Sequence, residues 1–239
     1  MELLLSPEAW IAFATLTALE LVLGIDNVIF ISILVDKLPP EQREKARKLG
    51  LFMAMFMRVG LLLALAWIVG LVAPLFTVLG HEVSGRDLIL MLGGLFLLWK
   101  STTEIHHSLE GADDGPSASA KASFASVIAQ IMVIDLVFSL DSIITAVGMV
   151  DEVAVMIAAV VASVALMMAF AKHIGEFVSA HPSIKMLALS FLVVVGVVLV
   201  AEGFEHHIPK GYVYFAMAFS VGVEMLNIRY RKKAARRAG

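Results

Sequence analysis

The sequence predicts an all-α, polytopic membrane protein with seven transmembrane helices. Of its 239 residues, 60% are hydrophobic and 16% are charged, whereas a soluble domain is about half apolar and about a quarter charged. The mean hydropathy is +0.91. The apolar residues occur in runs close to the roughly 20 residues that cross a bilayer, so a large soluble core does not explain the excess. The runs cover residues 9–35, 49–73, 86–104, 124–149, 153–172, 184–204 and 211–228.

Each run is expected to form a helix, because an open chain in hydrocarbon must satisfy its backbone hydrogen bonds internally. The first run is not a cleavable signal peptide, since no basic segment precedes it and it contains Glu20 and Asp26. The connections are too short for a second folded domain, so residues 1–239 form one membrane domain. The chain has no cysteine, which excludes a disulfide scaffold, an iron–sulfur centre and a thiolate metal site.

Positive charges gather at alternate ends of the predicted helices, with fifteen Lys or Arg on one side and two on the other. The fifteen lie in connection 36–48, beside connection 105–123, beside the connection between the fifth and sixth helices, and in the tail 229–239. The opposite side carries Arg86 and Lys210. Because cytoplasmic ends carry the excess of Lys and Arg, we expect the amino terminus outside and the carboxyl terminus in the cytoplasm.

The two halves of the chain resemble each other. ELVLGIDNVIF begins at Glu20 and DLVFSLDSIIT begins at Asp135, an offset of 115 residues; Glu104 and Glu202, at the ends of the third and sixth helices, match at an offset of 98. Three helices are an odd number, so the second copy must cross the membrane in the opposite direction. This predicts a 3+3 inverted repeat, a common plan of secondary transporters. The predicted divisions are repeat one 9–109, linker 110–123, repeat two 124–207, seventh helix 211–228 and basic cytoplasmic tail 229–239.

Four acids lie inside the predicted spans: Glu20, Asp26, Asp135 and Asp141. Each ionised carboxylate at the bilayer centre costs about 2.5–3.5 kcal/mol on insertion scales. They must therefore face one another, water, a cation or a basic partner. We expect Glu20 and Asp135 near the midplane and the two other aspartates six residues further on, toward opposite faces. The simpler alternative is that the four acids only hold helices together through hydrogen bonds.

The polar residues beside these acids complete a set of hard oxygen ligands. Carboxylate, amide and hydroxyl oxygens suit Mg²⁺, Ca²⁺ or Mn²⁺. The predicted ligands of the metal are Glu20, Asp26, Asn27, Asp135, Asp141 and Ser142.

Three further residues have supporting roles in this prediction. Arg58, the one base inside the predicted spans, either leaves the four acids with a net charge of −3 for a cation and a proton, or forms a plain ion pair between helices. In a straight helix Asp26 and Asp141 lie about 120° from the face of the other polar residues, at about 100° per residue. Either they use a second face, or the helices unwind near Gly24 and Ser139.

Glutamate and histidine recur at the end of the third helix of each repeat. Glu104 precedes His106 and His107, and Glu205 precedes His206 and His207. We consider Glu104, Glu202, His106 and His207 as an interfacial metal site or proton relay, with ordinary interfacial histidines as the alternative.

The paired acidic motifs, followed by HPSIKMLALSFL and PKGYVYFAMAFS, resemble the TerC family of bacterial inner-membrane proteins over nearly the whole chain. The resemblance is strongest to the short YgdQ-like members. It implies a multi-pass protein of the bacterial inner membrane, with a role in manganese homeostasis or tellurium resistance.

Together, the residues and the resemblance predict a divalent cation transporter and no enzyme. We expect export of Mn²⁺ by alternating access, driven by counter-transported protons, because the chain has no GxxxxGK[ST] nucleotide-binding motif. The partners are the bilayer, the transported cation and protons, without nucleic acid or a permanently bound cofactor; a homodimer is compatible with this. The alternatives are a helper that assembles or metalates extracytoplasmic proteins and an intramembrane aspartyl protease. The symmetry of the four acids and the absence of a GxGD sequence count against the protease.

Overall fold

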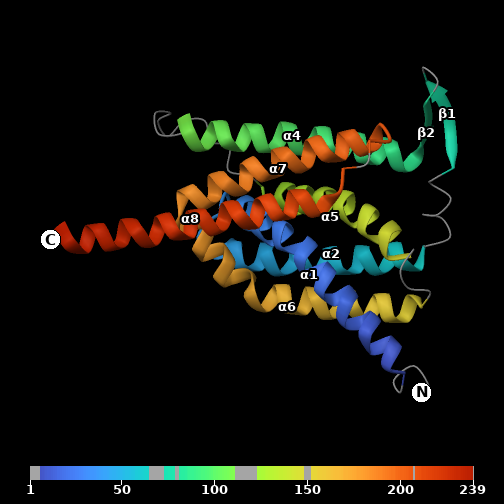
Figure 1. The fold of residues 1–239 in the computed structure, drawn as a ribbon, viewed down its shortest axis with the longest axis horizontal. Helices are drawn as coiled ribbons and strands as arrows, with labels where there is room; N and C mark the ends of the chain where they lie inside the picture. The colour runs from blue at the N-terminus through green and yellow to red at the C-terminus, as the bar shows by residue number, and fades with distance from the viewer. Residues whose placement is uncertain are drawn as a thin grey trace.

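A computed structural model describes residues 6–64, 73–78, 81–110, 123–147, 152–206 and 208–238. These residues form seven helices and one two-stranded hairpin (Figure 1). The helices are α1 (Pro7–Val35), α2 (Pro40–Leu63), α4 (Gly85–Glu110), α5 (Phe124–Val147), α6 (Val153–Ala180), α7 (Pro182–Gly203) and α8 (Lys210–Ala238).

Within the described ranges, five helices are long and apolar enough to cross a membrane: α1, α4, α6, α7 and α8. The apolar part of α5, Phe124–Leu140, is shorter, and α2 begins in a basic segment. A helical membrane protein is therefore confirmed, while seven complete spans remain a prediction.

Three helices extend well beyond their apolar runs: α2, α8, and α6, which continues to Ala180. The sequence placed a connection at 36–48, but α2 already begins at Pro40. Proline is well tolerated in the first turn of a helix, and the following Glu, Gln, Arg, Lys and Ala are strong helix formers. In the same way α8 continues through the basic tail to Ala238. Hydropathy identifies only the apolar part of such a helix, so these helices are longer than the predicted apolar runs.

The described residues are helical apart from one short hairpin, which the sequence did not predict. Strand β1 (Pro74–Val78) pairs antiparallel with β2 (His81–Ser84). The hairpin lies at the end of the bundle where α1 and α4 begin (Figure 1). Short strands with only a few β-branched residues, such as Thr77 and Val83, give no signal that a hydropathy profile resolves.

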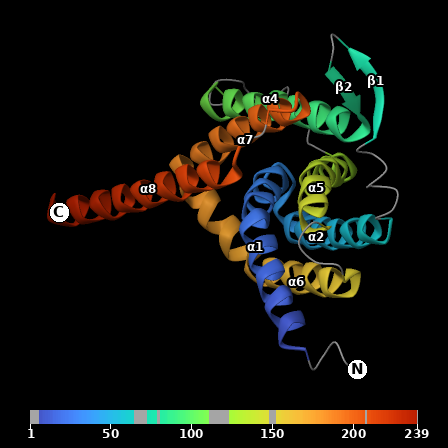
Figure 2. The same cartoon turned by 45° about the vertical axis from the view of Figure 1, so that its right-hand side comes forward.

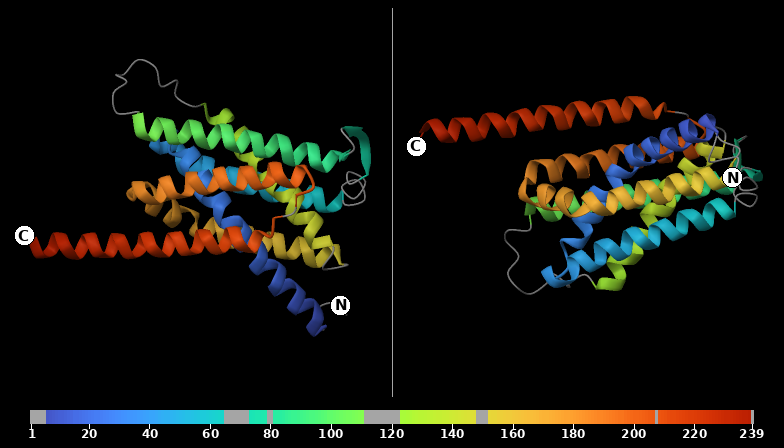
Figure 3. Two further views of the ribbon diagram at one scale, coloured as in Figure 1. Left: turned by 45° about the horizontal axis from the view of Figure 1, so that its top comes forward. Right: turned by 90° about the horizontal axis from the view of Figure 1, so that it is seen from below.

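The helices pack in pairs that combine the two halves of the chain. α4 packs along α7, α1 along α6, and α2 against both α5 and α6. α1 and α5 run in opposite directions through the bundle (Figures 1 and 2). α8 contacts α7 and extends beyond the bundle at its carboxyl end, as both views of Figure 3 show. Large apolar side chains on the outer faces, including Phe56, Trp99 and Phe215, are exposed, as expected for a surface in contact with lipid.

The α4–α7 pair depends on a close approach at Gly94. A Cβ added there would lie 2.6 Å from the carbonyl oxygen of Gly196 and 2.9 Å from the backbone nitrogen of Val200. Neither backbone atom can move aside by a change of rotamer. We therefore expect Gly94→Ala to lower the free energy of unfolding by about 1–3 kcal/mol, the usual cost of overpacking.

Thermal unfolding of the detergent-solubilised protein, followed by tryptophan fluorescence, measures this effect. Gly60→Ala is the matched control, because no atom lies within 4 Å of a Cβ added at Gly60. Equal melting temperatures for the two variants would show that the close contact at Gly94 does not stabilise the fold.

Candidate functional site

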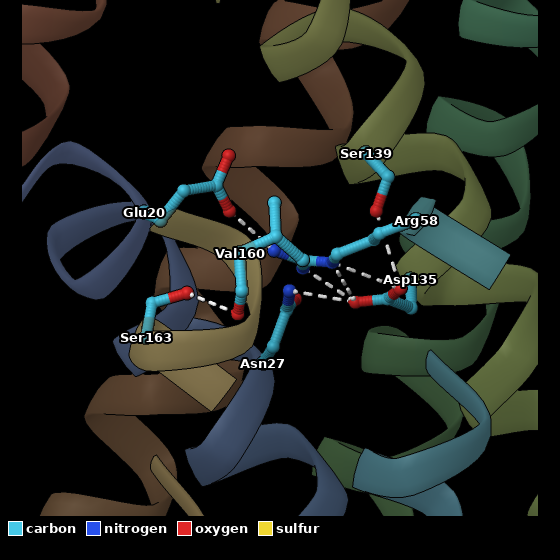
Figure 4. A network of polar contacts seen from close by, with 7 residues as sticks. All are labelled: Glu20, Asn27, Arg58, Asp135, Ser139, Val160 and Ser163. Carbon is cyan, nitrogen blue, oxygen red and sulfur yellow. Dashed lines mark hydrogen bonds and ion pairs between the residues drawn. The ribbon is translucent and has the colours of Figure 1, made fainter. Parts of the chain in front are cut away.

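A buried guanidinium lies at the centre of the bundle. Arg58 of α2 is 4% exposed. Its Nη1 lies 2.6 Å from Oε2 of Glu20 on α1, and its Nη2 lies 2.5 Å from Oδ1 of Asp135 on α5. Its Nε is 3.1 Å and 3.2 Å from the two oxygens of Asp135. Glu20 and Asp135, the first acids of the two sequence motifs, therefore both bind the guanidinium of Arg58 (Figure 4).

Two neutral side chains complete the hydrogen bonding of Asp135. The Nδ2 of Asn27 donates to Oδ1 at 3.3 Å, and the hydroxyl of Ser139 donates to Oδ2 at 3.1 Å. We call Glu20, Asn27, Arg58, Asp135 and Ser139 the central ion cluster. All five are buried. Because Asp135 accepts hydrogen bonds at both oxygens, it can bind a metal only if some of these contacts break.

Helical periodicity explains how the sequence assembles this cluster. Glu20 and Asn27 are seven residues apart on α1, and Asp135 and Ser139 are four apart on α5; both spacings place side chains on one face of a helix. The cluster thus confirms that these residues share a face. Arg58 forms ion pairs with both Glu20 and Asp135, so its described contacts agree with the ion-pair alternative for this arginine.

The helices do not unwind at Gly24 or Ser139. α1 is continuous from Pro7 to Val35 and α5 from Phe124 to Val147. A Cβ on Gly24 would lie 2.5 Å from Sδ of Met167, so the glycine permits the close packing of α1 on α6.

The structure tests only part of the predicted ligand set. The side chains of Asp26, Asp141 and Ser142 lie outside the described residues. Among the side chains that are described, no three from His, Cys, Asp or Glu come together in an arrangement that could hold a metal ion. One oxygen nevertheless remains available. Oδ1 of the buried Asn27 has no hydrogen-bond partner in the described part of the chain, although a buried amide oxygen normally has one.

The candidates at the helix ends have different environments. Glu104 is 3% exposed and bonds with Lys37, which follows α1, and with Lys100 at 2.9 Å. It thus forms a structural ion pair between the end of α1 and α4. His106 is exposed, with its ring centroid 6.2 Å from that of His107, and His207 lies outside the described residues.

Sequence reasoning missed two features of the buried polar structure. Ser163 of α6 is fully buried near the central ion cluster and donates to the carbonyl oxygen of Val160 at 2.9 Å (Figure 4). A single serine in an apolar run gave no signal for this. Lys37 was interpreted only as a topological charge; its position just after the end of the first span is the signal that could have linked it to Glu104.

Comparisons with known proteins agree with the pattern of the sequence. The integral membrane protein TerC family matches residues 5–238. The chain is 56% identical to the UPF0053 inner membrane protein YgdQ of Escherichia coli over 227 residues, covering 95% of both chains. It is 57% identical to a UPF0053 protein of Haemophilus influenzae, covering 97% of this chain and 98% of the relative. It also matches the inner membrane protein YoaE of E. coli at 54% identity, over 95% of this chain and 44% of the relative. No solved structure matches the chain.

Proposed function

The chain belongs to the TerC family of integral membrane proteins, and from this premise we propose that it exports a divalent metal cation, Mn²⁺, across the bacterial inner membrane. The observation that carries the proposal is the central ion cluster. Burying charged groups in a bundle is costly, and a bundle of this size can pack with apolar residues alone. The retained charges, and the amide oxygen of Asn27 left without a described partner, favour a polar path for a cation.

The packing of the helices supports an inverted repeat. In such a repeat α1, α2 and α4 correspond to α5, α6 and α7, respectively. Each contact between the halves should then have a counterpart in which the two halves are exchanged. The α1–α6 contact has the α5–α2 contact as its counterpart, and the α4–α5 contact has the α7–α1 contact; all four are present. α1 and α5 run in opposite directions, as such a repeat requires (Figure 1). Transport sites in repeats of this kind lie near the midplane, where the two halves meet.

The charges leave a place for the cation next to the cluster. Glu20, Asp135 and Arg58 together carry −1, and Asp26 and Asp141 would bring the total to −3. We propose that these two aspartates are the principal ligands of Mn²⁺, assisted by Asn27 and Ser142. In this proposal they are also the groups that exchange a metal for protons, since Arg58 already binds Glu20 and Asp135.

Protons are the proposed driving ions. Moving a divalent cation outward against an inside-negative potential costs about 2 × 2.3 kcal/mol per 100 mV. The sequence has no P-loop to couple ATP hydrolysis to this work. Two protons returning per cation would be electroneutral, and three would also use the potential. From the distribution of Lys and Arg we propose that the amino terminus lies outside and the carboxyl terminus in the cytoplasm.

Flux measured with purified protein in liposomes tests this function. We expect Mn²⁺ to cross the membrane faster than Ca²⁺ or Mg²⁺ when a pH gradient is imposed, and the flux to stop when a protonophore dissipates the gradient. Protein-free liposomes with the same gradient are the control. Absence of flux for all three ions would instead indicate a helper that acts only together with other proteins.

A further inference from the structure

A second acidic region lies at the end of the bundle that carries the hairpin. A cavity of about 330 Å³ opens where α4 begins and α7 ends. Four carboxylates line it, those of Glu82, Asp87, Glu202 and Glu205, with Arg86 as the one cation among the described lining residues. The lining therefore carries a net charge of −3, and it belongs to neither of the acidic motifs.

Asp87 has a structural role in this wall. Its Oδ2 accepts hydrogen bonds from the backbone nitrogen of Ser84 at 2.9 Å and from the hydroxyl of Ser84 at 2.6 Å. Its Oδ1 lies 3.8 Å from Nη1 of Arg86. These contacts fix the junction between β2 and α4, so Asp87 contributes charge to the cavity while remaining bound to its neighbours.

Glu202 has no such role. It is 4% exposed, it lines the cavity, and its Oε2 has no hydrogen-bond partner in the described part of the chain. A buried carboxylate oxygen without a partner loses its hydration and gains nothing in exchange. A ligand that supplies positive charge in the cavity would remove that cost.

Glu104 and Glu202 have different charged neighbours. Glu104 occupies the matching position of the other half and is buried to the same degree, at 3% exposure. Its carboxylate is neutralised by two fixed cations, Lys37 and Lys100. At one end of the bundle the chain thus supplies lysines, whereas around Glu202 it supplies three more carboxylates and one arginine.

We propose that this cavity binds a hydrated divalent cation, with Glu202 as its anchor and Glu205 and Glu82 as neighbouring ligands. Small divalent cations such as Mg²⁺ retain several waters when proteins bind them. Six waters at about 30 Å³ each need about 180 Å³, which the cavity provides. Binding through water also agrees with the lack of a convergent three-residue ligand set among the described side chains. A role of this cavity as the exit site of the transported cation depends on the proposed export, whereas the binding of a cation in the cavity does not.

A nitroxide label on the hairpin can detect this cation. The chain has no cysteine, so Thr77→Cys, at an exposed position of β1, gives a single labelling site in the full-length protein. Mn²⁺ broadens the nitroxide spectrum only at short range. We expect broadening that saturates with Mn²⁺ and is reversed by excess Mg²⁺, while a label at Gln42→Cys, at the opposite end of the bundle, shows no saturable effect.

Two variants decide where the cation binds. Glu202→Gln, which keeps the shape of the side chain, should raise the half-saturating Mn²⁺ concentration at least about tenfold, the effect typical of losing one partner of a metal site. Glu44→Gln is the matched control and should leave it unchanged. Lys48 holds the pKa of Glu44 below its ordinary value through a hydrogen bond and its charge, so this control also removes a full negative charge.

The proposed export and the proposed cavity site can fail separately. Asp26→Asn should leave the broadening at the hairpin intact even if it stops flux. The cavity proposal is overturned if the wild-type broadening does not saturate, if Glu202→Gln leaves the half-saturating concentration unchanged while the protein remains folded by circular dichroism, or if Asp26→Asn removes the signal.

Discussion

Replacing Arg58 with leucine is expected to lower the free energy of unfolding by about 3–5 kcal/mol, the cost typical of removing one partner from a buried ion pair. The substitution leaves Glu20 and Asp135 buried without the guanidinium that lies 2.6 Å and 2.5 Å from their oxygens. It also removes three of the contacts that hold Asp135 beside α2. This is the largest loss of stability that we predict for a single substitution.

Chemical unfolding in mixed detergent micelles measures this loss. Combining Arg58→Leu with Glu20→Gln and Asp135→Asn should recover a substantial part of the stability, because neutral amides do not need a buried cation. Recovery would show that uncompensated charge, and not the lost packing of the arginine stem, causes the damage. If the triple variant is as unstable as Arg58→Leu alone, the electrostatic explanation is wrong.

Asp26→Asn and Asp141→Asn should each reduce Mn²⁺ flux in proteoliposomes to the level of protein-free liposomes. Asparagine has the same shape, but it carries neither the charge that attracts the cation nor an exchangeable proton. Because the proposal assigns both aspartates to metal binding and not to the fold, we expect the free energy of unfolding to change by less than about 0.5 kcal/mol, as is usual away from structural interactions.

Asp135→Asn is the comparison variant for this experiment. It should lower stability as well as flux, since Asp135 accepts hydrogen bonds from Arg58, Asn27 and Ser139. Two classes of acid are thus expected, one essential to the fold and one to transport alone. Full flux in either Asp26→Asn or Asp141→Asn would defeat the assignment of the metal ligands.

Local sequence patterns predicted the helical membrane architecture and the grouping of the central residues. Each of the seven apolar runs overlaps a helix of the described residues, because exclusion of water from hydrocarbon leaves little choice of backbone structure. The spacings from Glu20 to Asn27 and from Asp135 to Ser139 predicted shared faces, because the helix period is fixed. The match between the two motifs also identified Glu20 and Asp135 as a pair, and the structure joins them through one arginine.

Features that depend on tertiary contacts could not be predicted in this way. Hydropathy missed the polar beginning of α2 and the hairpin, where few residues face lipid. The sequence also did not show which acids Arg58 binds, because that depends on how α2 packs against α1 and α5. Likewise Glu104 and Glu202 look equivalent in the sequence. Only the fold places lysines around the first and carboxylates around the second.

The position of Arg58 limits how the two halves can move. Arg58 and Glu20 belong to the first half and Asp135 to the second, so separating the halves at this point would break a buried ion pair. Under the proposed alternating access, a rocking motion that keeps this ion pair pivots at Arg58. The displacements of the helices are then largest at the two ends of the bundle, where the lysine-bound Glu104 and the cavity of Glu202 are located.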